Sequence, residues 1–478
     1  MRFTKKPFYS AALLILSCTF IIYLGRPTTL FNLFHGEFDP KLSVDRELAV
    51  YKRITEALRT VDRSCEEQGF YCKRPETQHV DCGRVLVGDK VYLQSLTGSN
   101  RIPLIENSFL NLTCSAIKSR IIPKTAQFKP LKLNGTAFAR IVFADYEFIE
   151  KQVQASYHPQ NVFCFAIDAN SSAEFQRKMK KLEQCLPNVV VLPVTESYDS
   201  KGHNINLAHY NCMKKLESLR GWGYLMLLQN HDVITKSVYE LDRIFELLGG
   251  VNDVFMSREI PERRKKHLKW DLKSLKLFRN DSKNSDYELE ISSGSVHSSL
   301  SRAAVKWLVE EVDLSIFIDQ WNQTDYGADE QFISTFQMSP DLKMPGHFTN
   351  ECIHNDTAIV TISRLARWVP IYLDRAAHCA TGTVRHDICI FGIEDFRAIS
   401  KFPILNVNKM LPAFDYSIIE CTAELLHNRT YLGQVDQKIE KNLYENLVSV
   451  QYHKNHRNPD YKLNCTSDFP PWNYSNYL

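Results

Sequence analysis

The chain has 478 residues, with 58 Lys and Arg against 55 Asp and Glu, and a formal net charge of +3. This length allows one large domain with appendages. The mixed charges, without a matching sequence motif, argue against a nucleic-acid partner.

The N-terminus predicts a membrane anchor. Residues 1–7 contain Arg2, Lys5 and Lys6, whereas residues 8–25 contain no charge. About 18 apolar residues, at roughly 1.5 Å rise each, just span a bilayer core. Because the basic residues precede this run, we expect a cytoplasmic tail at 1–7, a transmembrane signal-anchor at 8–25 and a lumenal remainder, as in a single-pass type II protein. A cleaved signal peptide is the alternative.

The cysteines and the glycosylation signals agree with a lumenal location. One of the 13 cysteines, Cys18, lies in the apolar run, and the remaining twelve allow complete pairing in an oxidising compartment. The absence of a Cys-x-x-Cys motif and of a histidine cluster argues against zinc. Sequons for N-glycosylation occur at Asn111, Asn134, Asn170, Asn280, Asn322, Asn355, Asn428, Asn464 and Asn473.

Composition divides the lumenal part into three regions. Residues 26–78 are interpreted as a stem, with a charged helical pattern at 44–61 and little that could form a core. Residues 79–430 have a globular composition. Residues 431–478 are polar and are expected to form a tail strapped to the surface.

Strand and helix patterns alternate in the globular region. Apolar strand-like runs occur at 138–143, 161–167, 188–194 and 224–228, and helical periods at 146–157, 173–185 and 206–219. This order predicts an α/β fold with a mostly parallel sheet covered on both faces. Asp168 and Asp232 come after two of these strands, where ligands collect in such folds; turn formation is the alternative role for each acid.

Three charged segments carry more than one interpretation. Within residues 324–331, TDYGADEQ, Asp329 and Glu330 suit the first turn of a helix, and a carboxylate placed to accept a proton is the alternative. The basic run at 263–266 is interpreted as a solvated helix face, with contact to an anionic substrate or lipid as the alternative. Residues 145–147, Asp-Tyr-Glu, are the nearest approach to an Asp-x-Asp motif and are interpreted as a helix cap.

The order and spacing of eight segments resemble one enzyme family. The segments are DCGRVLVGD (81–89), SYHPQNVFCFAID (156–168), NCMKKL (211–216), GYLMLLQNHD (223–232), ISSGSVHSSLSR (291–302), TDYGADEQF (324–332), ARW (366–368) and ICIFGIEDF (388–396). From about Cys82 to Cys421 they are similar to the core-2/I-branching β-1,6-N-acetylglucosaminyltransferases. The resemblance implies a GT-A-like α/β fold at 79–430, a Golgi type II membrane protein, and transfer of GlcNAc from UDP-GlcNAc with inversion and without a metal.

The resemblance also implies a catalytic residue. An inverting transferase needs one carboxylate that accepts the proton of the acceptor hydroxyl as this hydroxyl attacks. Glu330 matches the family's base. Asp329 is then expected to be a structural acid that accepts N–H bonds at the helix start.

Donor binding is expected to depend on fixed cations. The sequence contains no Asp-x-Asp motif, so positive side chains would have to stabilise the departing diphosphate. The residues that the resemblance places on the donor are Ile141, Asp168, Asp232, Arg385 and Lys409. A core position for Ile141 and a solvated position for each cation are the alternatives.

Acceptor binding is expected from a glycine turn, an acid, a base and aromatic side chains. Glycine lets a backbone approach a sugar closely, and an aromatic face can stack on one. The residues are Ser293, Gly294, Ser295, Glu259, Arg264, Trp368 and Tyr372. The sequence departs from the family pattern at 198–210 and 258–264, so acceptor identity and linkage stay open.

The family's disulfides carry over to eight cysteines. The implied pairs are Cys82–Cys421, Cys114–Cys185, Cys164–Cys212 and Cys379–Cys389. The four remaining lumenal cysteines are paired by conjecture as Cys65–Cys72 and Cys352–Cys465.

Our leading hypothesis is a Golgi enzyme, with its catalytic domain in the lumen, that adds β-1,6-linked GlcNAc to Gal- or GalNAc-containing O-glycans of glycoproteins. It would need no cofactor beyond its UDP-sugar substrate. The alternatives are a xylosyltransferase acting on a proteoglycan core protein and a catalytically inactive lumenal glycan-binding protein with the same fold. Whether the protein forms a homodimer stays open.

Overall fold

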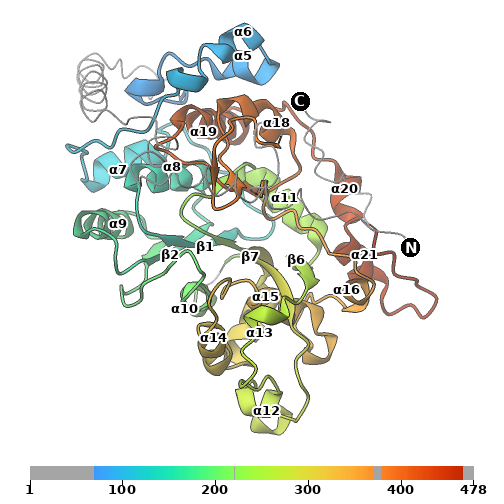
Figure 1. Ribbon diagram of the computed structural model, residues 1–478. Coiled ribbons are helices and arrows are strands. Elements are labelled where there is room, and N and C mark those ends of the chain that lie inside the picture. The colour runs from blue at the N-terminus through green and yellow to red at the C-terminus, as the bar shows by residue number, and fades with distance from the viewer. Residues whose placement is uncertain (1–68, 220, 371–377, 467–478) are drawn as a thin grey trace, which may run out of the picture. The chain divides into compact units, whose positions relative to one another are not determined.

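The structure is a computed structural model that describes residues 69–219, 221–370 and 378–466 (Figure 1). These residues belong to one compact unit, Asp62–Leu478. The predicted cytoplasmic tail, membrane anchor and most of the stem lie outside the described residues. Within the described ranges, no helix is both long and apolar enough to cross a membrane.

A six-stranded sheet with the order β3-β2-β1-β4-β7-β6 forms the centre of this unit. Its strands are β1 (Thr136–Val142), β2 (Val162–Ile167), β3 (Val189–Val191), β4 (Tyr224–Leu228), β6 (Asp253–Arg258) and β7 (Ser292–Ser301). The four strands β1 to β4 are parallel, and β7 runs antiparallel to both β4 and β6. The sheet is therefore mixed and mostly parallel, which confirms the predicted α/β class.

Two short sheets lie beside the main one. β5 (Val233–Ile234) pairs with β10 (Asn406–Val407), and β8 (Val384–Arg385) pairs with β9 (Ile388–Cys389). The first of these brings the segment after β4 next to the segment that precedes Lys409.

Helices pack on both faces of the sheet. Those before β6 are α5 (Cys82–Val87), α6 (Lys90–Gln94), α7 (Cys114–Ile121), α8 (Tyr146–Ser156), α9 (Ala173–Cys185), α10 (Ile205–Glu217) and α11 (Val238–Leu248). Those after β6 are α12 (Leu272–Leu275), α13 (Arg302–Glu310), α14 (Ser315–Trp321), α15 (Phe332–Met338), α16 (Glu351–His354), α18 (Phe396–Lys401), α19 (Tyr416–Tyr431), α20 (Lys441–Glu445) and α21 (Val448–Asn455). The helices α7, α8, α9, α11, α18 and α19 share one hydrophobic core, and α10, α13, α14 and α15 share another on the opposite face (Figure 1).

Strand β1 shows how the sequence pattern produces this arrangement. All seven of its residues are buried, and successive side chains point to opposite faces of a sheet. Phe138 and Val142 enter the first core, whereas Ala139 and Ile141 enter the second. Burial on both faces explains the continuous apolar run that predicted the strand. The third predicted strand, at 188–194, is shorter in the structure because Pro193, which has no N–H, follows it closely.

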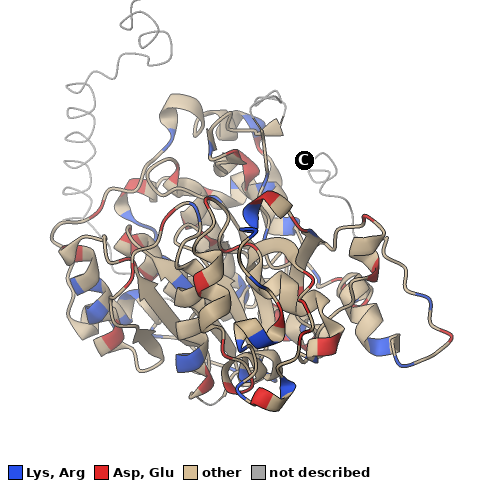
Figure 2. Cartoon of the chain, turned by 60° about the horizontal axis from the view of Figure 1, so that its bottom comes forward, with Lys and Arg blue, Asp and Glu red and all other residues tan. Residues whose placement is uncertain are grey.

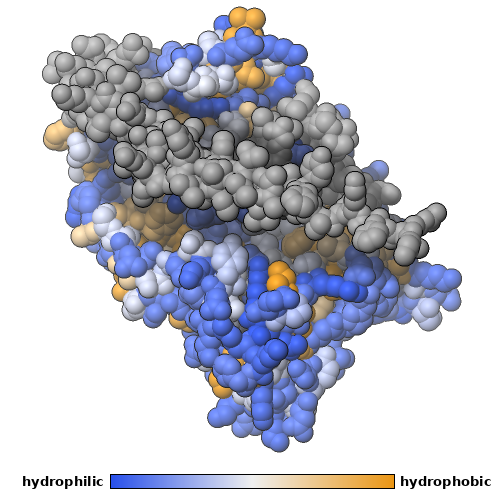
Figure 3. Space-filling view, viewed as in Figure 1, coloured by the Kyte–Doolittle hydropathy of each residue, from blue (hydrophilic) through white to orange (hydrophobic). Residues whose placement is uncertain are grey.

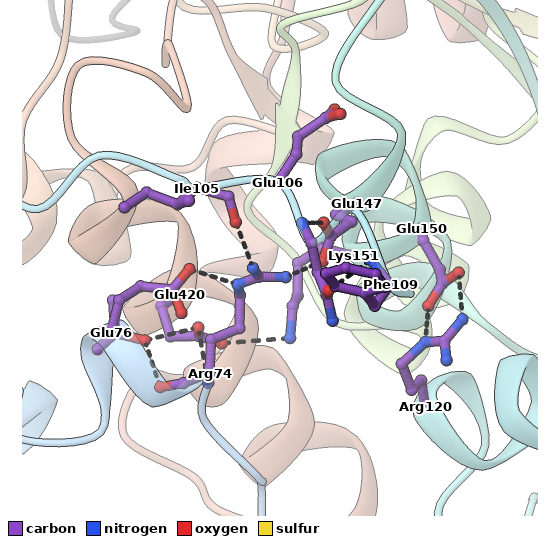
Figure 4. Close-up of polar contacts among 12 residues, drawn as sticks. Arg74, Glu76, Ile105, Glu106, Phe109, Arg120, Glu147, Glu150, Lys151 and Glu420 are labelled. Carbon is purple, nitrogen blue, oxygen red and sulfur yellow. Dashed lines mark hydrogen bonds and ion pairs between the residues drawn. The ribbon is translucent and has the colours of Figure 1, made fainter. Parts of the chain in front are cut away.

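The predicted boundary between stem and domain falls inside the folded unit. The Tyr71 hydroxyl and the Thr77 hydroxyl donate hydrogen bonds to the buried carboxylate of Glu420 in α19. The Arg74 guanidinium forms ion pairs with Glu76 and with Glu147 of α8 (Figure 4). Residues 69–78 therefore pack against the domain instead of ending a stem.

Disulfides fasten both ends of the described chain. The structure contains the four pairs that the resemblance implied, Cys82–Cys421, Cys114–Cys185, Cys164–Cys212 and Cys379–Cys389. It also contains the conjectured Cys352–Cys465 pair, which ties the segment after α21 to α16. Cys72 is disulfide-bonded as well, and its conjectured partner Cys65 lies outside the described residues.

Charges of both signs are interspersed over the chain (Figure 2). On the face seen in Figure 3, the described surface is mostly hydrophilic, with apolar side chains in small separate patches. The large apolar side chains that are exposed include Tyr326 and Trp368, each 53% exposed. Both belong to the site described below.

Candidate active site

The segment TDYGADEQ forms a loop in front of α15. The N-cap of α15 is Gln331, and no side chain caps the helix. Asp329 and Glu330 thus precede the helix, so the expectation that Asp329 accepts N–H bonds at the helix start is wrong. Gly327 shapes the loop with a φ of +69°, a conformation that side chains with a Cβ rarely adopt.

Glu330 is fixed through both its backbone and its side chain. Its carbonyl oxygen accepts a hydrogen bond from the Gly294 amide at 2.7 Å and from the Ser334 hydroxyl at 3.2 Å. Its carboxylate forms an ion pair with the Arg263 guanidinium, and the side chain remains 28% exposed. A partly exposed carboxylate held in this way is available to a second molecule.

The predicted turn Ser293–Gly294–Ser295 lies within strand β7 in the structure, and its glycine serves packing. A Cβ on Gly294 would lie 2.5 Å from the Phe255 carbonyl oxygen and 2.6 Å from Cβ of Ser334. The missing side chain at Gly294 lets β7 approach β6 and α15 closely, and thereby helps to position Glu330. This differs from the expectation that Gly294 makes room for a sugar.

Arg263 is a site residue that the sequence interpretation missed. The basic run is not a helix face, because a single 3-10 turn, Pro261–Arg263, is followed by irregular chain. Arg264, which was predicted to bind the acceptor, instead contacts Glu259 at 2.9 Å and Glu288 at 3.3 Å. The predicted acceptor residues Glu259 and Arg264 thus pair with each other, and the neighbouring arginine reaches Glu330. The sequence offered no signal that distinguishes the two arginines.

Asp329 has an environment that disfavours its charged form. Burial, and then the charge of Glu330, raise the pKa of the Asp329 carboxyl to about 7. Gly202, with a φ of +94°, packs against this carboxylate, and a Cβ there would lie 2.2 Å from Oδ1. The loop before α10, which belongs to the segment 198–210 that departs from the family pattern, therefore forms one wall of the site.

The three cations Arg364, Lys409 and Arg385 form a cluster through their mutual electrostatic interactions, and one of them, Arg364, was not predicted and also interacts with the two acids. Arg364 is partly buried, and the carboxylates of Asp232, Glu330 and Asp329 oppose the lowering of its pKa by burial. Burial, and then the charges of Arg364 and Arg385, lower the pKa of Lys409 to about 8.

Arg385 itself is exposed in β8. Arg364 was missed because it is an isolated arginine before the ARW segment and belongs to no recognisable sequence pattern.

Asp232 supports this cluster of cations through buried hydrogen bonds. It is fully buried, with Oδ2 2.8 Å from Nε2 of His297 and Oδ1 accepting a hydrogen bond from Asn408 at 2.8 Å. The Arg140 guanidinium donates to the Asp232 carbonyl oxygen, also at 2.8 Å. Burial therefore contradicts a direct contact between Asp232 and a donor, and its role is to hold the residue that precedes Lys409.

A pocket of about 560 Å³ opens at the carboxyl ends of β1 and β2. Asp168 lines it, together with Asp145 at the start of α8 and the buried Lys178 of α9. Asp145 occupies the N-cap position as interpreted, but its side chain contacts Nε2 of His231 at 2.8 Å and does not cap the helix. The His231 carbonyl oxygen in turn accepts from the Met410 amide, so two contacts through His231 connect Asp145 of the pocket with the residue that follows Lys409.

The remaining predicted contacts are distributed as follows. Ile141 is a core residue, 5% exposed, and its contact with a nucleotide stays a prediction. Ser293 is buried, whereas the Ser295 hydroxyl lies 3.3 Å from Nδ1 of His297. Trp368 bridges to Ile388 of β9 through its backbone and leaves its ring half exposed. Tyr372 lies outside the described residues.

The sequons differ in accessibility. The exposed ones are Asn111, Asn134, Asn170, Asn280, Asn355 and Asn464. Asn428 is partly buried, and Asn473 lies outside the described residues. The side-chain amide of Asn322 exchanges hydrogen bonds with Asn204, which competes with the predicted modification of Asn322.

Among the described residues, one group of His, Cys, Asp and Glu side chains places its ligand atoms close enough to hold a metal ion, Cys82, Cys421 and Glu424. The disulfide between the two cysteines removes their thiolates, so this group is not a metal centre.

Comparison with known proteins places this geometry in a family context. The model of the Core-2/I-branching enzyme family matches residues 136–400. The chain is 26% identical over 384 residues to a β-1,3-galactosyl-O-glycosyl-glycoprotein β-1,6-N-acetylglucosaminyltransferase of bovine herpesvirus 4 (strain LVR140), covering 76% of this chain and 85% of the relative. The same figures hold for enzyme 3 of that name from Ovis aries.

Among solved structures, core-mannan synthase A from Aspergillus fumigatus aligns with 43% of this chain and 70% of its own, at 9% identity and a TM-score of 0.21. That score is too low to support an argument.

Proposed function

The chain belongs to the Core-2/I-branching enzyme family and is a glycosyltransferase, and we propose that it transfers GlcNAc from UDP-GlcNAc, with inversion, in β-1,6 linkage onto Gal- or GalNAc-containing O-glycans. Its mixed, mostly parallel sheet is that of a GT-A-like glycosyltransferase fold. The names of the relatives motivate the donor and the linkage.

One observation carries the proposal: the candidate base and the cations share a site. The charges of Glu330 and Asp329 act on Arg364, and the charge of Arg364 acts on Lys409. Arg364 also donates a hydrogen bond at 2.8 Å to the side chain of Asn408, the residue before Lys409. A carboxylate in the same site as positive groups suits a reaction in which one substrate loses a proton and the other releases an anion.

In the proposed reaction, the acceptor hydroxyl oxygen attacks the anomeric carbon of the donor sugar. The new C–O bond forms on the face opposite the leaving group, which inverts the configuration. The hydroxyl proton passes to the carboxylate of Glu330. The bond between the anomeric carbon and the diphosphate oxygen breaks, and UDP leaves with its electron pair.

The cations are proposed to take the place of a metal ion in this step. Preorganised positive groups stabilise charge where it develops in the transition state, and they need no reorganisation during the reaction. Lys409 and Arg385 would contact the diphosphate. Lys409 is protonated below a pKa of about 8, so it carries its charge at neutral pH.

The pocket beside the cluster is proposed to hold the nucleoside. Its position beyond the strand tips is where α/β folds bind ligands, and the carboxylate of Asp168 can accept hydrogen bonds from a base or a ribose. The donor would thus extend from this pocket, past Lys409, toward Glu330. For the acceptor sugar, the half-exposed side chains of Trp368 and Tyr326 offer ring faces, and Tyr326 lies under the guanidinium of Arg263, which pairs with Glu330.

A location in the Golgi membrane, with the catalytic domain in the lumen, is part of the same proposal. A Golgi type II protein would present this site to the lumen, where disulfides persist. The five disulfides of the described residues support an oxidising compartment.

The test is a donor and acceptor screen on the secreted lumenal fragment in EDTA. UDP-GlcNAc and UDP-xylose are offered with mucin-type glycans and with a proteoglycan core peptide, and Glu330→Gln is the matched variant. We expect GlcNAc transfer without added metal, and a fall of about 10²–10⁴-fold in Glu330→Gln with unchanged UDP binding. Transfer of xylose would show that the donor is UDP-xylose and not UDP-GlcNAc. A requirement for Mn²⁺ would contradict the proposal that cationic side chains take the place of a metal ion. Full activity of Glu330→Gln would contradict the role of Glu330 as the base.

A further inference from the structure

Arg364 is a partly buried guanidinium without a carboxylate partner. Among the described residues, no acid lies within ion-pair distance of Arg364, Arg385 or Lys409, although thirty such pairs occur elsewhere, from Lys73–Glu424 to Lys441–Glu445. The Nε atom of Arg364 is buried and has no hydrogen-bond partner within the described part of the chain. A buried cation is costly unless an opposite charge compensates it, which points to an anion that binds beside it.

The orientation of Arg364 is set by a buried chain of hydrogen bonds. Its Nη2 donates to Oδ1 of Asn408, and Nδ2 of Asn408 donates to Oδ1 of Asp232, both at 2.8 Å. His297 closes the chain on the other oxygen of Asp232. Both Asp232 and His297 are fully buried, so the guanidinium is held before any ligand arrives.

The charges around Arg364 link the candidate base to Lys409. The carboxylates of Glu330 and Asp329 act electrostatically on Arg364, and the charge of Arg364 acts on Lys409. The hydrogen bond from Arg364 to Asn408 places the guanidinium beside the residue that precedes Lys409, so an anion that binds beside Lys409 is attracted by Arg364 as well.

We propose that Arg364 is a third cation of the donor site, and that its guanidinium contacts the diphosphate of the sugar nucleotide between Lys409 and Glu330. This rests on the proposed function for the identity of the ligand. The planar guanidinium can donate two parallel hydrogen bonds to phosphate oxygens, whereas Lys409 supplies a point charge. Arg364 would thus fix the direction in which the leaving group departs.

A purely structural role is the competing explanation, with Arg364 serving only to neutralise Asp232. Variants separate the two explanations. Arg364→Gln removes the charge and keeps a hydrogen-bond donor for Asn408, and Arg364→Lys keeps the charge without the planar fork. Arg397→Gln is the matched control, since Arg397 of α18 is also partly buried with an unpartnered Nε atom and packs near Gly88.

The experiment measures the binding of UDP and of inorganic pyrophosphate to the secreted fragment by titration calorimetry, with thermal unfolding as a check on folding. We expect Arg364→Gln to bind both ligands at least about tenfold more weakly, because the variant lacks at least one charge-assisted hydrogen bond to the ligand. Arg364→Lys should be intermediate, and Arg397→Gln should match the wild type.

The pH dependence gives a second readout, which checks that the charge of Arg364 acts on Lys409 in the protein. Lys409 faces Arg364, Arg385, Asp232 and His386. In the wild type, affinity should fall as the pH rises through about 8, because Lys409 loses its proton. Without Arg364, one of the two cations that lower this pKa is gone, so the fall should move to higher pH.

The outcomes are distinct. Equal affinities in Arg364→Gln and the wild type, or wild-type protein that binds neither ligand, would overturn the assignment of Arg364. A wild type that binds UDP but transfers no sugar would overturn the proposed function, and the comparison of the arginine variants would still decide the role of Arg364.

Discussion

The guanidinium of Arg263 forms an ion pair with the carboxylate of Glu330, although 67 positions separate the two residues in the chain. The pairing depends on Gly327, where a Cβ would lie 2.6 Å from the centre of the guanidinium. The Thr324 hydroxyl holds the backbone of Arg263 by donating to its carbonyl oxygen. The loop TDYGADEQ thus positions both the candidate base and the cation that orients it.

Arg263→Met should reduce catalysis without weakening donor binding. The carboxylate of Glu330 would lose its fixed direction, and a displaced base transfers protons less efficiently. We expect kcat to fall about tenfold or more while the affinity for UDP stays unchanged, with Arg263→Lys in between. Steady-state kinetics and calorimetry check this.

Arg258→Met is the control for that variant. Arg258 pairs with Asp356 at the surface, with 61% of its side chain exposed, and such pairs contribute little. A rise in kcat of Arg263→Met would mean that the ion pair restrains the base instead of positioning it.

Gly294→Ala should impair both folding and activity. The added methyl group would overlap the Phe255 carbonyl oxygen and Ser334, and it would disturb the 2.7 Å hydrogen bond from the Gly294 amide to Glu330. Overpacking of this kind costs about 1–3 kcal/mol, so thermal unfolding should occur at lower temperature. Gly83→Ala in α5 is the control, because alanine is favoured in a helix and only the Asp81 side chain lies near. Wild-type stability and kcat in Gly294→Ala would refute the packing role.

The sequence predicted the sheet better than the site. Strands such as β1 and β4 are buried on both faces, so their continuous apolar runs identified them. The cysteine pairs followed from a family resemblance, because spacing alone does not determine pairing. These features depend on local composition or on a shared framework.

The site depends instead on which side chains distant loops bring together. Arg263 and Arg264 are adjacent, and only the folded loop decides which of them reaches Glu330. Arg364 follows no periodic pattern, and its role appears only when Asn408 and Asp232 lie beside it. Asp232 sits after a strand as predicted, but burial by His297 and Asn408 makes it a support for the site.

Asp329→Asn should make stability less dependent on pH. The native carboxyl keeps its proton up to a pKa of about 7, whereas the unfolded chain releases it near its ordinary value of about 4. Unfolding therefore releases a proton between these values, so wild-type stability falls as the pH rises through this window. Asparagine cannot titrate, so the melting temperature of the variant should exceed that of the wild type by a margin that grows from pH 4 to 7, reaching about 2 °C or more.

Asp325→Asn is the comparison for this window. Asp325 lies in the same loop, and its hydrogen bond with Lys265 lowers its pKa, so its variant should show no such growing margin. A constant difference between Asp329→Asn and the wild type from pH 4 to 8 would contradict the raised pKa.

Removal of the Cys352–Cys465 disulfide should destabilise the protein without changing the chemistry. The bond closes a loop of 113 residues in sequence and ties the C-terminal segment to α16. Loss of a native disulfide typically costs about 2–5 kcal/mol. The variant with both cysteines changed to serine should unfold at lower temperature and retain kcat once folded; an unchanged melting temperature would show that the tie contributes no stability.

Asn170 should lack a glycan in the active protein, although it is an exposed sequon. Asn170 and Ser171 line the pocket at the carboxyl ends of β1 and β2, and the hydroxyl of Ser172, the third residue of the sequon, caps α9 by accepting from the Phe175 amide. A glycan there would stand at the mouth of the proposed nucleoside site.

Glycopeptide mass spectrometry of the secreted protein measures the occupancy of Asn170 against the exposed sequon Asn355. We expect Asn355 to carry glycan, Asn170 to carry none, and Asn170→Gln to keep the wild-type KM for the donor. Full occupancy of Asn170 in protein that binds UDP with unchanged affinity would mean that the nucleoside enters elsewhere. Occupancy that blocks binding, relieved by Asn170→Gln, would instead support the position of the pocket, because a surface glycan remote from the donor could not produce that effect.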